Sequence, residues 1–427
     1  MFELRARGTT VGRELRGAIA TFLTMAYILF ANPQILEAAG VPFHSAVACT
    51  ALAAGICSIL MGLIANFPLA LASGMGLNAL VAFTIAPAAG SWQAAMGLIV
   101  LDGIVTLLLV LAGLREAVMN AIPRGLRLAT GAGIGLFIAF IGLVNAKIVV
   151  MSGIPSAPVK PGTLRDASTA IALIGLLITA ALLARKITGA LVIGIVITTL
   201  IAVIFKVAPI PKEFAWPTFR DLAFHADVRG AMKWSLMPLL FSVVMVDFFD
   251  TLGTATAVAE EAKLIDGRGR IPRIRRVLLV DSISASIGGM LGASSVTSYI
   301  ESAAGVAEGA RTGLHSVFVG IFFLLAIAFA PFMAIVPPAA TAPALILVGF
   351  LMISQMAKID FNDPASAIPA FIILITIPLS YSIAHGIGYG FIAYASIKLL
   401  SGRARQVHPL MFVVAALFGA YFVWGAN

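Results

Sequence analysis

Four polar side chains interrupt apolar stretches of the chain, and their types could bind a small ligand and exchange a proton. Asp250 follows Asp247 by three residues in "VDFFDTLGTATA", so both carboxyl groups lie on one face of a helix. Glu301 lies among small residues in "TSYIESAAGVAEGARTGL", and Asn78 lies in "GMGLNA". Because burial in a low-dielectric medium favours the protonated form of a carboxyl group, such acids can take up and release protons near neutral pH.

The elements that carry these side chains are long apolar segments. The chain has 427 residues, of which 60% are hydrophobic and 11% are charged, with a mean hydropathy of +1.05. A soluble domain would carry about 25% charged residues. Apolar runs of about 20 residues recur from end to end, and they do not alternate as barrel strands would. The sequence therefore predicts an all-α polytopic membrane protein in a lipid bilayer.

The net charge of +9 indicates topology rather than nucleic-acid binding. Lys and Arg cluster in alternate loops, which are the cytoplasmic loops if the N-terminus is inside, and the densest group lies between Lys263 and Arg276. Residues 1–16 are expected to form a cytoplasmic lead without a cleavable signal peptide.

The hydropathy pattern predicts fourteen segments and one further apolar run, 409–425, that has no assigned place. The segments are roughly 17–38, 44–66, 68–88, 91–113, 122–147, 168–186, 189–206, 234–258, 276–293, 294–309, 314–333, 338–357, 365–380 and 382–400.

Two of these segments, the third and the tenth, are interrupted. Residues 68–88 contain "SGMG", and each glycine costs a helix about 1 kcal/mol relative to alanine. Residues 277–308 would make one helix of about 48 Å, too long for a hydrocarbon core of about 30 Å. A glycine cluster ending at Gly292 provides a break. We expect "TSY" to be extended and a helix to restart near Glu301.

The offset of seven segments predicts an inverted repeat, because duplicating an odd number of spans inverts the second copy. Transporters of this kind pair discontinuous helices near the membrane midplane, where half-helix N-termini face the substrate. Non-helical backbone at that depth is tolerated only inside protein or along a cavity. The alternative is a pair of kinked helices that pack through small residues.

The two interrupted segments would offer complementary groups to a ligand. At a half-helix N-terminus the Glu301 carboxylate is stabilised by the helix dipole and can accept two parallel N–H bonds. The Asn78 amide can both donate and accept. This pair suits a planar ligand with mixed donors and acceptors. For the acids around Asp250, a hydrogen-bonded patch between helices is the alternative.

Three further acids in apolar segments are interpreted as structural. Acids at membrane depth usually face the protein interior or a cavity. We expect each of these to bond to a neighbouring helix or to Ser and Thr side chains. They are Asp102, Asp247 and Asp281.

Four motifs follow one another between residues 17 and 314. They are "GAIATFLTMAYILFANPQIL" in segment 1, "GMGLNA" in segment 3, "VDFFDTLGT" in segment 8 and "TSYIESAAGVAEGARTGL" in segment 10. In this order and spacing they resemble the nucleobase–ascorbate transporter (nucleobase:cation symporter-2) superfamily, and within it the AzgA-like purine permeases. Similar permeases often follow "GMGLNA" with aromatic residues, whereas here Leu80 and Val81 follow. Phe249 or its neighbour Phe248 is then the candidate for an aromatic face.

The resemblance implies fourteen spans in two inverted repeats of seven, with short antiparallel strands in segments 3 and 10. It also implies a core domain and a gate domain that move against each other. The expected bounds are 17–206 and 233–427 for the repeats, 207–232 for an extracytoplasmic loop, 17–113 plus 233–333 for the core, and 122–206 plus 338–427 for the gate.

The resemblance also implies a function. Similar proteins import adenine, guanine or hypoxanthine by proton symport across the inner (plasma) membrane, through an elevator or rocking motion, and relatives of this fold often form homodimers. Carried over to this chain, Glu301 is the main base-binding carboxylate and Asp250 is the acid tied to substrate and proton, so both are candidates for proton coupling. The other expected substrate contacts are Asn78, Thr254, Phe249 and the backbone of Tyr299 and Ile300.

The sequence leaves open which purine is preferred and whether sodium replaces the proton. An anion transporter of the same fold would need a basic group at the site, and the sequence offers none there. An intramembrane aspartyl protease needs two carboxylates that share a proton, and its usual Gly-x-Gly-Asp context is missing. We therefore expect no enzyme activity, no metal and no cofactor.

Overall fold

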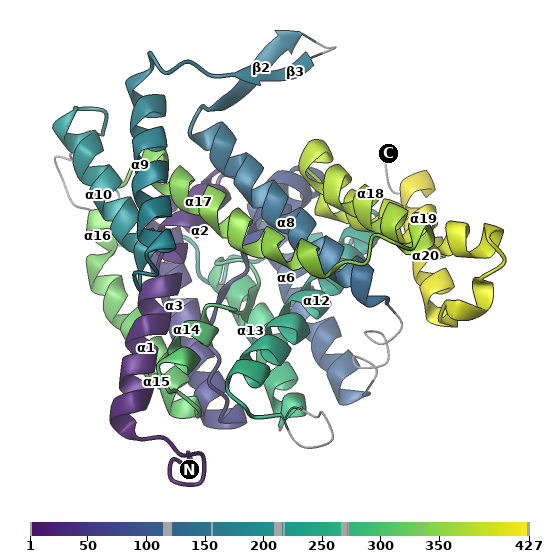
Figure 1. Cartoon of the computed structure of the whole chain (residues 1–427), viewed down its shortest axis with the longest axis horizontal. Coiled ribbons are helices and arrows are strands. Elements are labelled where there is room, and N and C mark those ends of the chain that lie inside the picture. Colours follow the sequence, from purple (N-terminus) through teal and green to yellow (C-terminus); the bar gives the residue numbers. More distant parts are fainter. Residues whose placement is uncertain are drawn as a thin grey trace.

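The chain folds almost entirely into helices (Figure 1). The computed structural model describes residues 2–113, 122–154, 157–208, 216, 218–265, 271, 273–333 and 335–424, without the side chains of Pro238, Phe248, Phe249, Leu252, Gln355 and Trp424. Among the described residues, eight helices are long and apolar enough to span a membrane, and five apolar helices are shorter. The prediction of a polytopic helical membrane protein is confirmed, whereas the count of fourteen spans is not.

The elements follow the expected order of apolar segments. In the first half they are α1 (Val11–Met25), α2 (Ile28–Glu37), α3 (Phe43–Leu60), β1 (Leu71–Ser73), α4 (Met75–Leu80), α5 (Ala86–Ala89), α6 (Trp92–Leu111), α8 (Arg124–Asn145), β2 (Val149–Ile154), β3 (Ala157–Pro161), α9 (Ala167–Ala184) and α10 (Ala190–Ile204). In the second half they are α11 (Val228–Ala231), α12 (Met237–Glu261), α13 (Ile274–Leu291), β4 (Val296–Ser298), α14 (Ser302–Ala307), α15 (Gly313–Ala326), α16 (Ala330–Met333), α17 (Pro338–Ile353), α18 (Pro364–Ser380), α19 (Ile383–Leu400) and α20 (Pro409–Trp424).

The two interrupted segments meet through their strands, as predicted. β1 and β4 pair antiparallel, with Leu71 opposite Ser298 and Ser73 opposite Val296. α13 ends at Gly292, which has φ +72° and donates its N–H back to the last turn. This left-handed conformation suits glycine, so the glycine cluster does stop the helix before the strand.

The first apolar segment departs from the expected single helix over 17–38. α1 already begins at Val11, where the Thr10 hydroxyl accepts a hydrogen bond from the N–H of Arg13 at 3.3 Å and caps the helix. The helix stops at Met25 and resumes as α2. Tyr27 lies in the break between the two helices.

Two sets of helices make many contacts with one another, and the paired strands contact the first set. α3 contacts α13 and α15, and α13 also contacts α6. Separately, α8 contacts α17 and α18, while α18 contacts α19 (Figure 1). α12 contacts β4, α14 and α4, so this helix lies beside both interrupted segments.

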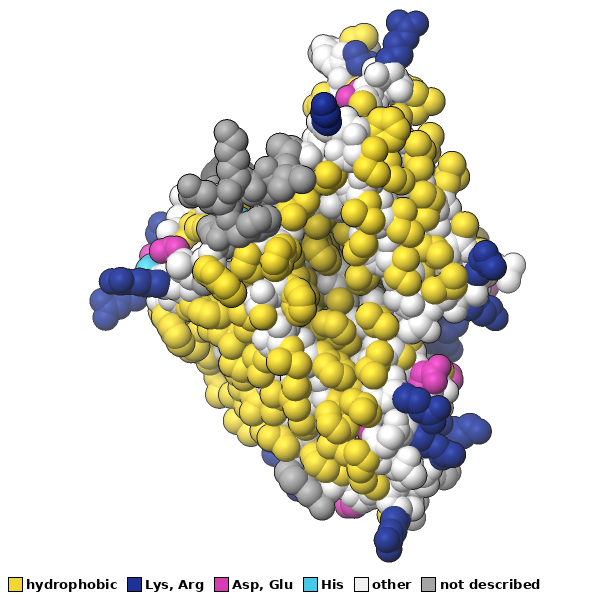
Figure 2. All heavy atoms as spheres, turned by 90° about the vertical axis from the view of Figure 1, so that its left-hand side faces the viewer, with side chains coloured by type: hydrophobic (Ala, Val, Ile, Leu, Met, Phe, Trp, Pro, Cys, Tyr) yellow, Lys and Arg dark blue, Asp and Glu magenta, His cyan; other side chains and the backbone are white. Residues whose placement is uncertain are grey.

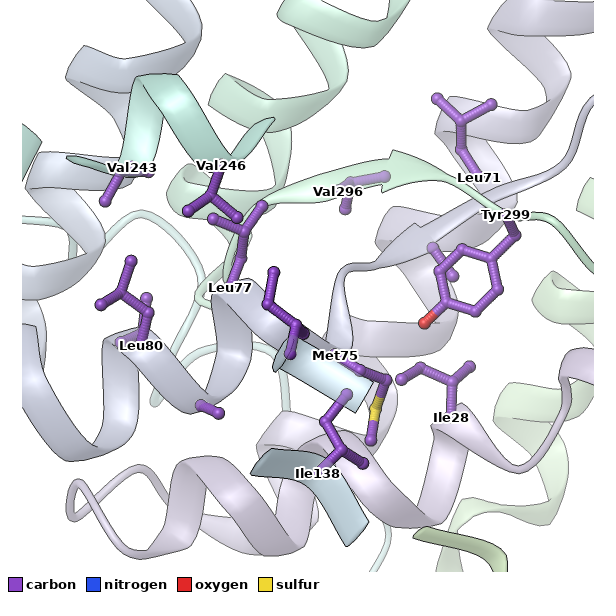
Figure 3. Packing of buried hydrophobic residues seen from close by; sticks show 14 of the residues in the cluster. Ile28, Leu71, Met75, Leu77, Leu80, Ile138, Val243, Val246, Val296 and Tyr299 are labelled. Carbon is purple, nitrogen blue, oxygen red and sulfur yellow. The ribbon is translucent and has the colours of Figure 1, made fainter. Parts of the chain in front are cut away.

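Buried apolar side chains close around the interrupted segments. Figure 3 shows Val243 and Val246 of α12 facing Leu77 and Leu80 of α4, and all four are buried. Between helices in a bilayer, such contacts act through close packing, because lipid tails are as apolar as these side chains. The packing holds α12 firmly against α4.

Two features concern the periphery. The hairpin of β2 and β3 projects beyond the helices (Figure 1), at a place where the sequence predicts no helix or strand.

Figure 2 shows a broad hydrophobic face with Lys and Arg side chains at its edges. Exposed Leu200 (58%) and Leu325 (60%) are examples of apolar side chains that a bilayer would cover.

Candidate ligand-binding site

Glu301 stands where the strand of the second interrupted segment gives way to a short helix. It is the N-cap residue of α14, where the sequence predicts the helix to restart. Its Oε1 atom accepts a hydrogen bond from the Tyr27 hydroxyl at 2.9 Å. Tyr27 is 1% exposed, so the packed ring fixes the position of that hydroxyl. The carboxylate keeps further acceptor positions for a ligand.

Asp250 approaches the same strand from α12. Its Oδ2 atom lies 3.4 Å from the hydroxyl of Thr297 in β4. Asp250 and Glu301 are close enough for their charges to interact. Thr254, one turn later on α12, is 7% exposed. The fold thus places Asp250 beside β4 and Glu301 just after that strand, so the two acids that the sequence singled out lie along one segment.

Asn78 is a buried amide in the first interrupted segment. It lies in α4 and is 0% exposed. Neither its Oδ1 nor its Nδ2 has a hydrogen-bond partner among the described residues. A buried polar group left unsatisfied costs about 1–3 kcal/mol, and native proteins rarely keep one without a reason. A polar ligand beside α4 would satisfy both atoms.

The remaining expected contacts differ in what they can offer. Tyr299 donates its N–H to the Ala70 carbonyl at 3.0 Å, and its own carbonyl accepts from Ser302 at 3.1 Å. A ligand contact through this backbone would therefore use the second lone pair of the carbonyl. Ile300 is 42% exposed. The side chain of Phe249 lies outside the described residues.

The three acids interpreted as structural are all buried. Asp281 accepts hydrogen bonds from Thr251 at 2.7 Å and from Ser298 at 3.2 Å, which are partners of the expected kind. Asp102 accepts from Thr106, one turn along its own helix, at 3.4 Å. Asp281 is thus bonded to both α12 and β4, next to the site.

The comparisons with known proteins bear on this arrangement of half-helices and strands. The profile of the family described as Permease family (Xan_ur_permease) matches residues 12–389. The chain belongs to this permease family. The permease is 42% identical to the adenine permease AdeP of Escherichia coli (strain K12), over 98% of this chain and 94% of that protein. It is 40% identical to the guanine/hypoxanthine permease PbuG of Bacillus subtilis (strain 168), over 99% of each.

The fold of the permease is shared more widely. The transmembrane domain of the cyanobacterial bicarbonate transporter BicA superposes with a TM-score of 0.67 at 16% sequence identity, covering 87% of this chain and 96% of that one. This likeness concerns the fold alone. The family and its relatives confirm the resemblance to AzgA-like purine permeases, and they make the protein a multi-pass transporter rather than an enzyme.

Tyr27 and Asn32 both lie in the first motif of the permease, but the sequence predicted no role for either residue. Asn32 is 0% exposed and donates through Nδ2 to the Thr50 hydroxyl at 2.8 Å and to the Ala293 carbonyl at 3.1 Å. α2 thereby holds the turn that precedes β4. Both residues could have been identified by their polarity within an apolar segment, because buried polar groups need partners.

An apolar groove of about 270 Å³ lies between α1 and α15, and none of the site residues lines it. Its lining residues are Ile19, Phe22, Leu23, Phe322, Leu325, Ala326 and Phe329. Several of these are exposed, so the groove lies on the outer surface. Within the described part of the chain, no cluster of three or more His, Cys, Asp or Glu residues could hold a metal ion.

Proposed function

We propose that this permease imports purine nucleobases together with protons. The observation that carries the proposal is the Asn78 amide, which is buried in one half-helix without a partner among the described residues. Glu301 starts the other half-helix, and Asp250 lies beside the strand that precedes it. The names of two relatives matched over nearly their whole length, an adenine permease and a guanine/hypoxanthine permease, support a purine as the substrate.

The hydrogen-bonding groups match the edges of a purine. The Glu301 carboxylate accepts N–H donors, and two parallel bonds would orient a flat base. The Asn78 amide donates to a ring nitrogen or carbonyl and accepts from an amino group. Adenine, guanine and hypoxanthine all present such mixed edges, so these side chains suit the class without selecting one member.

Proton coupling follows from the pair of acids. With Asp250 and Glu301 both ionised, their charges repel each other in a low-dielectric surrounding. A proton on either acid relieves this repulsion, and a neutral base can then dock without adding charge. We assign the proton to Asp250 in the first place and to Glu301 as the alternative. Sodium remains open as the coupling ion.

Alternating access would move a core domain against a gate domain. The contacts of α3, α6, α13 and α15 support a core over 17–113 plus 233–333, and those of α8, α17, α18 and α19 support a gate over 122–206 plus 338–427. We propose an elevator or rocking motion of these two bodies, with the N-terminus on the cytoplasmic side of the inner membrane.

Uptake measurements test this function. Cells lacking their own purine uptake would express the permease and receive radiolabelled adenine, guanine or hypoxanthine at two external pH values, with and without a protonophore. We expect saturable uptake of at least one purine that rises at the lower pH and collapses with the protonophore. Preferential inhibition by uracil or xanthine would overturn the substrate class. Uptake that follows a sodium gradient and ignores the protonophore would overturn the coupling ion.

A further inference from the structure

Asp281 is a buried acid that the proposed cycle leaves unused, and its hydrogen bonds lead to the site. It lies in α13 and is 0% exposed. Its Oδ2 accepts from the Thr251 hydroxyl at 2.7 Å, and its Oδ1 accepts from the Ser298 hydroxyl at 3.2 Å. Thr251 belongs to α12 and Ser298 to β4. The carboxylate therefore ties the helix that carries Asp250 to the strand that leads to Glu301.

A second hydroxyl links this carboxylate to Asp250. The Thr297 hydroxyl oxygen lies 3.2 Å from that of Thr251 and 3.4 Å from Oδ2 of Asp250. Hydrogen-bonding distances therefore run without interruption from Asp250 through Thr297 and Thr251 to Asp281. We call this series the hydroxyl chain: it consists of Asp250 on α12, Thr297 on β4, Thr251 on α12 and Asp281 on α13.

The number of hydrogens decides how this chain is bonded. Each threonine hydroxyl has one hydrogen to donate and can also accept. Thr251 donates to Asp281, at the shortest of these distances. Thr297 then donates either to Asp250 or to Thr251. An ionised Asp250 only accepts, so Thr297 donates to it, whereas a protonated Asp250 donates to Thr297, which turns to Thr251.

We propose that Asp281 and Thr251 are positioning residues for proton coupling. They supply the fixed acceptor that the Thr297 hydroxyl needs when Asp250 carries the proton. This inference rests on the function proposed above, in which Asp250 takes up a proton. Thr297 is the central residue of β4, so reversal of its hydrogen bond acts on the strand that leads to Glu301. Proton uptake at Asp250 is thereby transmitted to the base-binding carboxylate.

Four ionisable side chains among the described residues interact with the charge on Asp250 or Asp281. Within interaction range of the charge on Asp250 or Asp281 lie Glu301, Tyr27, Tyr299 and Cys57. None of these side chains carries a positive charge. A proton on one of the carboxylates lowers the repulsion within this set, and the orientation of the Thr297 hydroxyl depends on that protonation.

The test compares Thr251→Val with Thr251→Ser in proteoliposomes that contain the full chain. Valine keeps the shape of threonine and removes the hydroxyl, whereas serine keeps the hydroxyl. Two fluxes of radiolabelled adenine are measured: accumulation driven by an inward proton gradient, and exchange of internal for external adenine at equal pH. A gradient of about one pH unit with one coupled proton sustains about a tenfold adenine gradient, because each unit is a factor of ten in proton activity.

We expect Thr251→Val to lower the accumulation ratio from about ten towards about one while exchange stays within about threefold of the unmodified permease. Thr251→Ser should restore accumulation. Thr130→Val is the matched control, because the buried Thr130 hydroxyl donates to the Leu126 carbonyl of its own helix at 2.9 Å. This control should leave both fluxes unchanged.

A second variant protects the test against a folding defect. If Thr251→Val no longer binds adenine in a thermal-shift assay, Asp281→Asn is judged by the same two fluxes. Full accumulation by either adenine-binding variant would overturn the role of the hydroxyl chain while leaving the proposed function intact. No gradient-driven accumulation of adenine, guanine or hypoxanthine by the unmodified permease would instead contradict the proposed function itself.

Discussion

The Tyr27 hydroxyl donates a hydrogen bond to Glu301 over 2.9 Å, although the two residues are 274 positions apart. Tyr27 lies in the break between α1 and α2, and Glu301 starts α14. The contact therefore joins the first motif of the chain to the last. It also occupies one acceptor position on Oε1, and the positions that remain on the two oxygens define the direction from which a base binds.

Removal of this hydroxyl tests how much the fixed orientation contributes. Tyr27→Phe is expected to weaken adenine binding by about tenfold or more, since a hydrogen bond to a charged group contributes about 1.5–3 kcal/mol. The measurement is the adenine concentration that half-saturates the thermal shift of the purified permease. Tyr394→Phe, at a buried tyrosine of α19, is the matched control and should bind adenine normally. Equal affinities for both variants would contradict a positioning role for Tyr27.

Neutralisation of Glu301 should affect binding more strongly. Glu301→Gln removes one acceptor and puts an N–H₂ donor against the N–H edge of the base, so we expect purine affinity to fall by about a hundredfold. Equilibrium binding of labelled adenine checks this. The control is Glu308→Gln, at an exposed position just beyond the end of α14. Proton-dependent uptake at the normal rate by Glu301→Gln would remove this residue from the site.

The interrupted segments could be predicted because their signals are local. Glycines, the length of 277–308 and the small residues around Glu301 all lie within one stretch of sequence, and each has a direct effect on helix continuity. The pairing of β1 with β4 then followed from the inverted-repeat resemblance. Local chemistry and internal symmetry together gave the position of the acid at the start of α14.

The environment of Glu14 shows what could not be predicted. Glu14 lies in the lead that the sequence predicts to be cytoplasmic, and it is 0% exposed. Its carboxylate accepts the backbone N–H groups of Arg311 at 2.8 Å, Thr312 at 3.3 Å and His315 at 3.1 Å. The Glu14 carboxylate thus satisfies N–H groups that have no acceptor within the helix at the start of α15. These donors lie about three hundred residues away, and no local pattern identifies them.

Asp363, the N-cap residue of α18, offers a pH-dependent test. The pKa of Asp363 is lowered to about 2, because Lys398 donates to its carboxylate at 3.0 Å and Ser366 adds a second hydrogen bond. In the unfolded chain, an aspartate carboxyl group has a pKa of about 3.9. The lowered pKa means that the stabilisation is complete above about pH 4 and is lost as the pH falls towards about 2.

We therefore expect Asp363→Asn to lower the melting temperature at neutral pH, and this difference from the unmodified permease to shrink as the pH falls below about 4. The Lys398 side chain is 5% exposed, so the variant also leaves a buried cation without its partner. Asp166→Asn is the control, because its partner Lys147 is 60% exposed. A pH-independent difference for Asp363→Asn would show that the effect is not electrostatic.

The unpaired amide of Asn78 leads to a prediction in which stability and binding change in opposite directions. Asn78→Leu has a similar volume and removes two buried polar atoms that lack partners, so the empty permease should become more stable by about 1–2 kcal/mol. Adenine should then add less stabilisation than it adds to the unmodified permease, because the amide that would bond to the base is gone. Asn32→Leu is the matched control: the Asn32 amide nitrogen is bonded to Thr50 and Ala293, and its loss should destabilise the empty protein. Thermal melts of both variants with and without adenine separate these cases. A less stable Asn78→Leu that still responds fully to adenine would show that Asn78 serves the fold and not the ligand.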